Sequence, residues 1–168
     1  AIRANRKSKS KKVLCAGTVH PLYLKVVEDI VSNQGISIDV VAMDEQALLL
    51  DPKALEEYAG QDYAALVIPQ PNFFGALEDV NTLTNWGQAN GMLVVGVVNP
   101  MALALLSPPG EWGDNGADIA VGEGQPMGIP LASGGPYFGF ICCKQKLVRQ
   151  MPGRIIGRTV DLEGKDGF

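Results

Sequence analysis

The chain has 168 residues, of which 46% are hydrophobic and 19% charged, and its formal net charge is −4. This length and composition are typical of one globular domain with a hydrophobic core and exclude a disordered chain. The apolar runs are far too short to span a bilayer, and no secretory signal peptide is visible, so no membrane partner is expected.

Charge is unevenly distributed along the chain. The first twelve residues carry six of the fourteen basic side chains and no acidic one, and the remainder carries eight basic against eighteen acidic side chains, a net charge of −10. A basic run can bind nucleic acid, but the acidic body argues against a nucleic-acid-binding domain. We interpret the run as a solvated helix end that leads into the first strand.

The two ends of the chain carry little structural signal. The sequence starts at Ala1 without a helix start signal, its first methionine is Met43, and no closing element precedes Phe168. We therefore expect residues 1–168 to be a single α/β domain and a fragment of a longer chain.

The first half of the sequence alternates strand and helix signals. Residues 12–18 are a short apolar run that predicts a buried strand, and residues 36–43 predict a second strand. Between them, Pro21 suits the first turn of a helix and a polar residue before it can cap that helix. Leu22, Val26 and Ile30 give this helix one apolar face. Residues 44–60 predict two weak helical turns, the second starting at Asp51-Pro52.

The second half continues the alternation. Residues 63–69 and 92–98 predict a third and a fourth buried strand, separated by a loop at 70–75 and a helix at 77–89. We expect four side chains of that helix to face inward: Leu77, Val80, Leu83 and Trp86. A short helix near 101–106, a polar loop at 107–116 and strands at 118–122 and 137–143 follow, and residues 144–151 predict a last helix.

Strands that are apolar on both faces and alternate with helices predict an α/β sheet covered on both sides. Between the last two strands, residues 121–140 hold six glycines and three prolines, so they read as a shaped loop with its tightest point at Gly134-Gly135-Pro136. Such a loop is either a structural connector or a backbone surface that closely approaches a phosphate or a partner chain.

Familiar catalytic motifs are missing from the sequence. It contains no G-x-G-x-x-G after the first strand, no P-loop and no G-x-S-x-G motif. His20, the only histidine, is a better candidate for a helix cap or packing residue than for a catalytic base. Asp118 and Glu123 are expected near one end of a predicted strand, where acidic side chains more often solvate a loop than form a catalytic pair.

Two further sets of residues leave simple alternatives. Arg154 and Arg158 can hold an anion or a carboxylate, or form a salt bridge to Asp161 or Glu163. The cysteines are Cys15, Cys142 and Cys143; the last two are adjacent, which disfavours a disulfide, and no Cys/His spacing suits zinc. We expect buried, reduced cysteines and no metal site.

Four segments together resemble one family. They are T-V-H-P near the start, I-P-Q-P-N-F-F-G-A-L-E-D in the middle, G-E-G-Q-P-M-G-I-P-L-A-S-G-G-P-Y-F-G-F, and R-Q-M-P-G-R-I-I-G-R-T-V-D. They are similar to the glycine cleavage system P-protein, the decarboxylating glycine dehydrogenase, in its subunit 1 (alpha) form. The resemblance covers essentially the whole chain. It implies the large α/β/α domain of fold-type I enzymes that use pyridoxal phosphate (PLP), with a mostly parallel sheet and one antiparallel strand.

The resemblance also indicates two positions that hold the cofactor in the catalytic half of the family. A lysine forms the Schiff base with PLP, and an aspartate pairs with the pyridine nitrogen, which keeps the ring an electron sink. Matching the family's motifs places Gln125 at the lysine position and Gly96 at the aspartate position, and no lysine occurs between Lys53 and Lys144. No catalytic residue is therefore predicted here, and this chain is expected not to bind PLP covalently.

From the resemblance we expect a non-PLP-anchoring part of a heterotetrameric glycine decarboxylase. Its subunit 2 (beta) would hold PLP, and lipoylated H-protein would receive the aminomethyl group. Ser133, Gly134 and Gly135 would face the phosphate of the partner's PLP. The two-subunit form implies a cytoplasmic location. Two alternatives stay open: a catalytically silent binding module that completes the partner's fold, and an independent α/β transferase that uses the glycine-rich loop.

Overall fold

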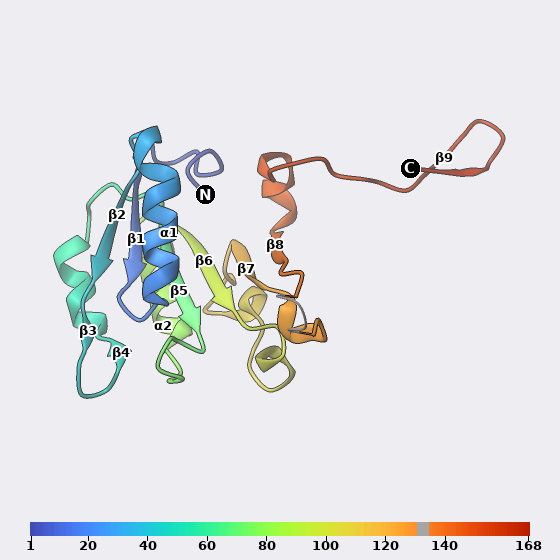
Figure 1. The fold of residues 1–168 in the computed structure, drawn as a ribbon. Coiled ribbons are helices and arrows are strands. Elements are labelled where there is room, and N and C mark those ends of the chain that lie inside the picture. Colours follow the sequence, from blue (N-terminus) through green and yellow to red (C-terminus); the bar gives the residue numbers. More distant parts are fainter. Residues whose placement is uncertain (131–134) are drawn as a thin grey trace.

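The computed structural model describes residues 1–130 and 135–168, and its centre is a six-stranded sheet in the order β2-β1-β5-β6-β7-β8 (Figure 1). The strands are β1 Lys12–Ala16, β2 Ser37–Val41, β5 Ala65–Gln70, β6 Leu93–Val98, β7 Ile119–Glu123 and β8 Gly139–Cys143. Neighbouring strands are parallel except β7 and β8, which are antiparallel. This confirms the predicted mostly parallel sheet with one antiparallel strand.

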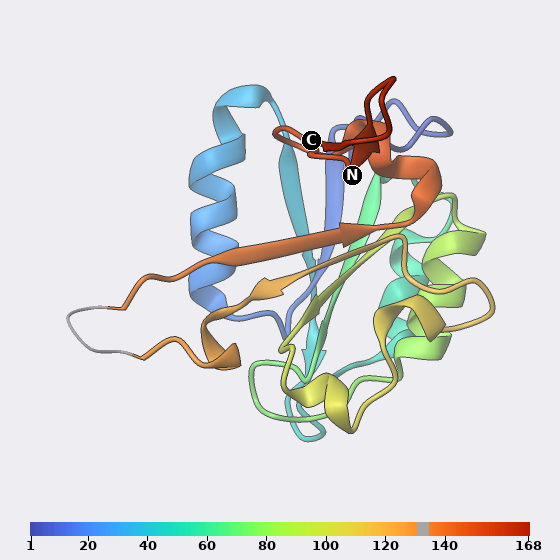
Figure 2. The ribbon, with the colours of Figure 1, turned by 90° about the vertical axis from the view of Figure 1, so that its right-hand side faces the viewer.

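Two helices lie on opposite faces of the sheet. Helix α1, Pro21–Val31, joins β1 to β2, and helix α2, Val80–Ala89, joins β5 to β6. These connections cross the sheet in opposite directions, and because both are right-handed they place their helices on opposite faces. Figure 2 shows the resulting three layers edge-on, which confirms the predicted α/β/α arrangement.

Residues 44–60 differ from the prediction of two helical turns. The first turn is a hairpin of β3, Met43–Asp44, and β4, Leu49–Leu50. It forms because the Asp44 carboxylate accepts hydrogen bonds from the N–H groups of Gln46 and Ala47, which closes a tight turn in place of a helix. The second is a 3₁₀ helix, η2 Pro52–Tyr58, and begins as predicted behind the Asp51 cap.

The remaining short elements are also 3₁₀ helices and hairpins. The segment predicted as a helix at 144–151 is the 3₁₀ helix η7, Gln145–Gln150. The others are η1 Ser32–Gln34, η3 Ala102–Ala104, η4 Pro109–Glu111 and η5 Gln125–Met127, together with a C-terminal hairpin of β9 Thr159–Val160 and β10 Asp166–Gly167.

The face of the sheet beneath α2 is fully packed. Leu14, Leu66, Ile68 and Val94 from three neighbouring strands have no exposed surface, and Trp112 completes this side of the core. The helix contributes Val80 and Leu83 as buried residues and Trp86 as a partly buried one. Leu77 was also expected to face inward, but it is 51% exposed because Asp79 caps α2 and the helix starts only after it.

The opposite face of the sheet is mostly open. Helix α1 is its only helix among the described residues, and none of the eleven residues of α1 is buried. The apolar row Leu22, Val26 and Ile30 is 63%, 54% and 64% exposed. The expectation of a sheet covered on both sides is therefore met on one face only.

The basic N-terminal segment is a series of turns, not the predicted helix end. Its fixed point is Asn5, whose buried side-chain amide donates hydrogen bonds to the carbonyls of Ala64 and Gly91, at 2.8 and 2.9 Å. The Asn5 side-chain oxygen accepts from the N–H groups of Lys7 and Ser8. These bonds fasten the segment to the chain just before β5 and β6.

The cysteines are free, as expected, but not all are buried. Cys15 in β1 is buried, and burial raises the pKa of its thiol to about 12. Cys142 is exposed and Cys143 is half-buried, because β8 is the edge strand of the sheet and is open on both sides of this stretch. The expectation of buried cysteines is therefore confirmed for Cys15 and wrong for Cys142 and Cys143.

The C-terminal segment extends away from the sheet and ends in the β9–β10 hairpin (Figure 1). Arg158 pairs there with Asp166, 3.1 Å from its Nε, and not with Asp161 or Glu163. The antiparallel register places Asp166 opposite Val160, which brings its carboxylate within reach of Arg158, whereas Asp161 accepts backbone hydrogen bonds from Glu163 and Lys165.

In the described part of the chain, no helix is long and apolar enough to cross a membrane.

Candidate functional site

A hollow of about 300 Å³ opens at the carboxyl edge of the sheet. Its walls come from residues at or just after the ends of β1, β5, β6 and β7, including His20, Asn72, Asn99 and Glu123. The chain leaves β1 toward β2 on one side and β5 toward β6 on the other, so strand order reverses between β1 and β5. Ligands of open α/β sheets bind outside the carboxyl ends of the strands at such a reversal. This hollow is therefore the candidate functional site.

Aromatic rings bridge the two sides of that reversal. The His20 ring stacks on Tyr23 at 4.9 Å between centroids and meets the edge of Phe73 at 4.6 Å. His20 Nδ1 also accepts a hydrogen bond from the N–H of Leu22, which caps α1. The interpretation of His20 as a cap and packing residue is confirmed, and its ring forms one wall of the site.

A buried carboxylate that the sequence reading missed supports this wall. Glu78 accepts hydrogen bonds from the Thr18 hydroxyl at 2.6 Å, from the Asn72 amide at 2.9 Å and from the Leu50 N–H at 3.0 Å. Glu78 thus ties the end of β1, the β3–β4 hairpin and the loop after β5 together. Its sequence signal was slight, a single glutamate directly before the Asp79 helix cap.

The loop after β5 is shaped by Asn72. Its side-chain oxygen accepts from the N–H groups of Phe74 and Ala76, and its amide donates to the Leu48 carbonyl. The Phe73 N–H bonds to the Thr18 carbonyl at 2.9 Å. These bonds hold the Phe73 ring against His20, so the P-N-F-F-G motif serves to build the wall.

Asp118 and Glu123 do not form a pair, because they lie at opposite ends of β7. Glu123 is at the carboxyl edge and borders the candidate site. Burial, and then the hydrogen bond and charge of Glu123, raise the pKa of Tyr23 to about 12. Tyr23 of α1 and Glu123 of β7 therefore both border the site.

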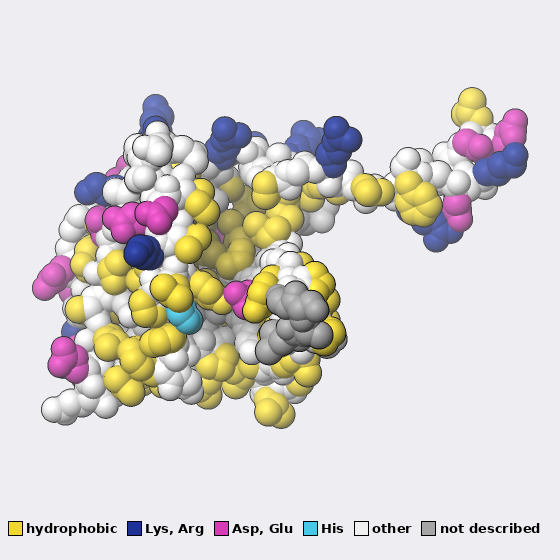
Figure 3. Space-filling view, in the orientation of Figure 1, with side chains coloured by type: hydrophobic (Ala, Val, Ile, Leu, Met, Phe, Trp, Pro, Cys, Tyr) yellow, Lys and Arg dark blue, Asp and Glu magenta, His cyan; other side chains and the backbone are white. Residues whose placement is uncertain are grey.

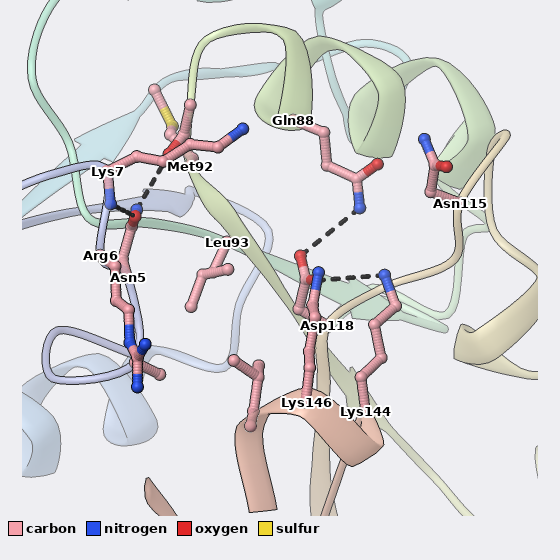
Figure 4. A pocket seen from close by; sticks show the side chains of 13 residues that line it. Asn5, Arg6, Lys7, Gln88, Met92, Leu93, Asn115, Asp118, Lys144 and Lys146 are labelled. Atoms are coloured by element: carbon pink, nitrogen blue, oxygen red, sulfur yellow. Dashed lines mark hydrogen bonds and ion pairs between the residues drawn. The ribbon is translucent and has the colours of Figure 1, made fainter.

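Asp118 lies at the amino edge, in a second hollow of about 720 Å³ (Figure 4). Its buried carboxylate accepts from Lys144 at 3.1 Å and from the Val94 N–H at 3.1 Å, with Lys146 at 3.5 Å. Burial alone raises the pKa of the Asp118 carboxyl, but these three contacts outweigh it and hold the pKa below its ordinary value. Asp118 and Lys144 therefore form a structural ion pair, and the contacts of Asp118 join β6, β7 and the residues after β8.

The two positions indicated for a PLP anchor are both occupied by packing and turn interactions. The Gln125 amide donates to the Ile129 carbonyl at 2.7 Å and closes the η5 turn. At Gly96, an added Cβ would lie 2.8 Å from the buried Trp112 ring, on the packed face of the sheet. A carboxylate has no room at Gly96, and the amide of Gln125 cannot form a Schiff base, so the residues present do not fit a covalently held PLP.

Of the three residues predicted to face the phosphate, only Gly135 belongs to the described residues. Ser133 and Gly134 lie outside the described residues. Gly135 has φ +49°, in the left-handed region that favours glycine. The two candidate anion-binding arginines, Arg154 and Arg158, belong to the C-terminal segment that extends away from the sheet. Arg158 is paired there with Asp166.

Comparison with known proteins identifies the family. A model of the glycine cleavage system P-protein matches residues 1–168. Curated relatives include a probable glycine dehydrogenase (decarboxylating) subunit 1 of Alcanivorax borkumensis, 64% identical over 168 residues, and one of Nitrosospira multiformis, 61% identical over the same length. Both alignments cover all of this chain, which spans 37% of the length of each relative.

Solved structures agree with the sequence comparison. A crystal structure of glycine decarboxylase (P-protein) of the glycine cleavage system, in inhibitor-bound form, matches with a TM-score of 0.85 and 38% identity. The match covers 98% of this chain and 36% of that chain. O-acetylhomoserine sulfhydrylase of Wolinella succinogenes matches with a TM-score of 0.57 at 17% identity and shows the shared fold alone. Sequence over the full length and fold over nearly all of it thus make this chain a member of the glycine cleavage system P-protein family.

Proposed function

We propose that residues 1–168 form part of the non-PLP-anchoring subunit of a glycine decarboxylase. The intact complex would decarboxylate glycine and transfer the remaining aminomethyl group to the lipoyl arm of H-protein. Its companion, subunit 2, would hold PLP, and the complex would act in the cytoplasm. Family membership and the relatives' names, subunit 1 of glycine dehydrogenase, support this proposal.

The observation that carries the proposal is the packing at Gly96 and Gln125. The Trp112 ring leaves no space for an aspartate side chain at position 96, and Gln125 serves the η5 turn. Glutamine cannot form an imine, and residues 54–143 contain no lysine. A subunit built in this way needs a second polypeptide to supply the cofactor.

This chain's own contribution would be to shape the carboxyl-edge site. His20 and Phe73 provide an aromatic wall, and Glu78 fixes the loops behind it. The glycine-rich stretch would face the partner's cofactor phosphate through Ser133, Gly134 and Gly135. Successive backbone N–H groups suit an anion, and a serine hydroxyl adds a donor.

The test uses the complete subunit 1 polypeptide that contains these residues, mixed with its companion and PLP. Borohydride reduction followed by peptide mapping should place the cofactor adduct on the companion. Glycine decarboxylation should appear only when both subunits are present. A Gln125→Ala variant serves as the matched control, and its complex should give the same adduct yield.

A reduced cofactor adduct on a lysine of subunit 1 that forms only in the folded complex would overturn the proposal, as would full glycine decarboxylation by subunit 1 alone. Adducts on the N-terminal lysines are expected from free PLP. They are recognised because they also form without the companion and in urea-unfolded protein.

A further inference from the structure

The hollow around Asp118, which we call the amino-edge hollow, is built by four segments that are far apart in the sequence. They are residues 4–7, the end of α2 with the turn into β6, residues 115–118, and the residues after β8. The hollow measures about 720 Å³ and shares no lining residue with the carboxyl-edge site. Concave sites of this size are typical of small-molecule binding.

The lining of the amino-edge hollow is basic, although the chain as a whole is acidic. Four cationic side chains border it, Arg6, Lys7, Lys144 and Lys146, and one acidic side chain, Asp118, so the formal charge of the lining is +3. The chain carries a net charge of −4. Figure 3 shows Lys and Arg side chains along this edge of the sheet, at the top of the view. Walls of one sign of charge raise the local concentration of counter-ions, so the hollow favours an anion.

The carboxylate of Asp118 does not use up this positive charge. Its Oδ1 atom lies 3.1 Å from Lys144 Nζ and 3.5 Å from Lys146 Nζ, so two ammonium groups share one negative charge. Lys144 also donates to the Gly116 carbonyl at 2.9 Å. The Lys146 side chain is 65% exposed and makes no hydrogen bond in the described part of the chain. Its ammonium group can therefore donate to a ligand.

The opposite wall carries two more cations on an anchored backbone. The buried Asn5 amide donates to the carbonyls of Ala64 and Gly91, and the Asn5 side-chain oxygen accepts from the Lys7 N–H at 3.0 Å. Arg6 and Lys7 thus project from a fixed segment. Neither has an ion-pair partner among the residues that the structure describes.

The two walls bring like charges together around one space. Figure 4 shows Arg6 and Lys7 on one side of the hollow, Lys144 and Lys146 on the other, and Leu93 between them. Like charges repel, and an anion placed between them relieves that repulsion. Because Asn5 fixes one wall and Asp118 the other, the cations are held in place before a ligand arrives, which favours binding.

We propose that the amino-edge hollow binds a small polyanion, a phosphorylated or polycarboxylate molecule with several negative charges. Arg and Lys are the side chains that bind such groups, through charge-assisted hydrogen bonds. Pyrophosphate is the probe, because it is small, multiply charged and offers acceptors to both walls. The proposal rests on the charges and shape of the hollow and not on the proposed activity, so the two can fail separately.

The experiment uses the complete subunit 1 polypeptide that contains these residues, alone and in complex with subunit 2 and PLP. Calorimetric titration with pyrophosphate at low salt measures the affinity. The variants Lys7→Gln and Lys146→Gln, one from each wall, should each weaken binding about fivefold or more. The matched control is Lys9→Gln, which removes the same charge from the same basic segment outside the hollow and should leave the affinity unchanged.

Urea unfolding of the same proteins provides a second readout. Pyrophosphate should raise the urea midpoint of the wild type and of Lys9→Gln more than that of the two hollow variants, because a ligand stabilises the state that binds it. Lys144 is kept in every variant, since it pairs with the buried Asp118. If Lys146→Gln lowers stability without pyrophosphate, Lys7→Gln decides alone, because the Lys7 side chain is exposed.

Three results would overturn the proposal. Pyrophosphate binding that is absent, or equal in the wild type and both hollow variants, would mean that the hollow is not an anion site. An equal loss for Lys9→Gln would show an attraction to the whole basic segment and not to the hollow. Binding of a polyglutamate peptide that both hollow variants weaken, without binding of pyrophosphate, would make an acidic protein segment the occupant.

Discussion

The two faces of the sheet use the same strands but differ in what covers them. On the α2 face, Leu66 and Val94 have no exposed surface, while Val67 and Val95, their neighbours in sequence, line the floor of a hollow on the α1 face. Both sets are aliphatic residues of the same strands, so the two faces are equally apolar in sequence. The difference teaches that an apolar strand pattern predicts that a sheet face is to be buried, but does not predict which segment buries it.

The largest expected effect is that of an aspartate at Gly96, on the packed face. Its Cβ would meet the Trp112 ring, and its carboxylate would be buried without a partner. We expect Gly96→Asp to lower the free energy of unfolding by more than about 4 kcal/mol, measured by urea denaturation. Val97→Asp faces the hollow and should lower it by less than about 2 kcal/mol. Equal losses for the two variants would contradict the difference between the faces.

Truncation of neighbouring leucine and valine side chains sharpens the same comparison. Leu66 is fully buried beneath α2, so Leu66→Ala should lower the free energy of unfolding by about 3 kcal/mol. Val67 borders the hollow, and Val67→Ala should lower it by about 1 kcal/mol or less. Thermal and urea unfolding of both variants measure this difference, and a larger loss for Val67→Ala would show that the hollow is filled in solution.

The ion pair of Asp118 tests whether polar contacts also hold the strands together. The folded-state pKa of this carboxyl is below its unfolded value, so the folded protein binds the proton more weakly. Its contribution is therefore complete above about pH 4 and is lost as the pH falls through the folded-state pKa. We expect Asp118→Asn to lower the free energy of unfolding by about 2 kcal/mol at pH 7.

The same variant should also flatten the acid limb of the stability profile. The wild-type protein should lose stability more steeply than Asp118→Asn below pH 4, since only the wild type has this proton to take up. Parallel profiles down to pH 2 would mean that Asp118 and its lysines do not stabilise the fold. Asp166→Asn is a suitable control, because Asp166 pairs with Arg158 in the exposed hairpin.

The last prediction concerns function more than stability and is made at Gly135, in the glycine-rich stretch. A valine at φ +49° is strained by about 1–3 kcal/mol, and it would disturb the backbone proposed to face the partner's cofactor. We expect Gly135→Val to lower PLP affinity or glycine decarboxylation of the complex while subunit 1 stays folded. Circular dichroism and PLP titration of one sample separate these effects. Gly157→Val, at a glycine with open space around it, is the control. A folded Gly135→Val complex with unchanged PLP binding and activity would refute the role of the loop.

Much of the scaffold was predictable because its signals are local. Apolar runs located the six sheet strands within a few residues, and Pro21 and Asp51 marked the helix starts. The hairpin at 43–50 was missed because an aspartate followed by polar residues can start either a turn or a helix. The choice between them depends on Leu50, whose N–H bonds to Glu78 far along the chain.

The candidate site was less predictable because it depends on contacts between distant segments. His20 and Phe73 are 53 residues apart in the sequence, and Glu78 binds Thr18 from 60 residues away. Spacing along the chain also suggested that Asp118 and Glu123 were close, yet five residues of extended strand place them at opposite edges of the sheet. Only the packing at Gly96 could give a physical reason for the missing aspartate.

The anchoring of Asn5 sets a practical limit on how the domain can be shortened or tagged. Its amide donates to two carbonyls that precede β5 and β6, so removal of the first five residues would take this donor from the Gly91 carbonyl and leave the Ala64 carbonyl with the Leu93 N–H alone. A shortened version of the domain for crystallisation should therefore retain Asn5. The basic segment thus has a structural role through Asn5, and this attachment does not involve the side chains of its lysines and arginines.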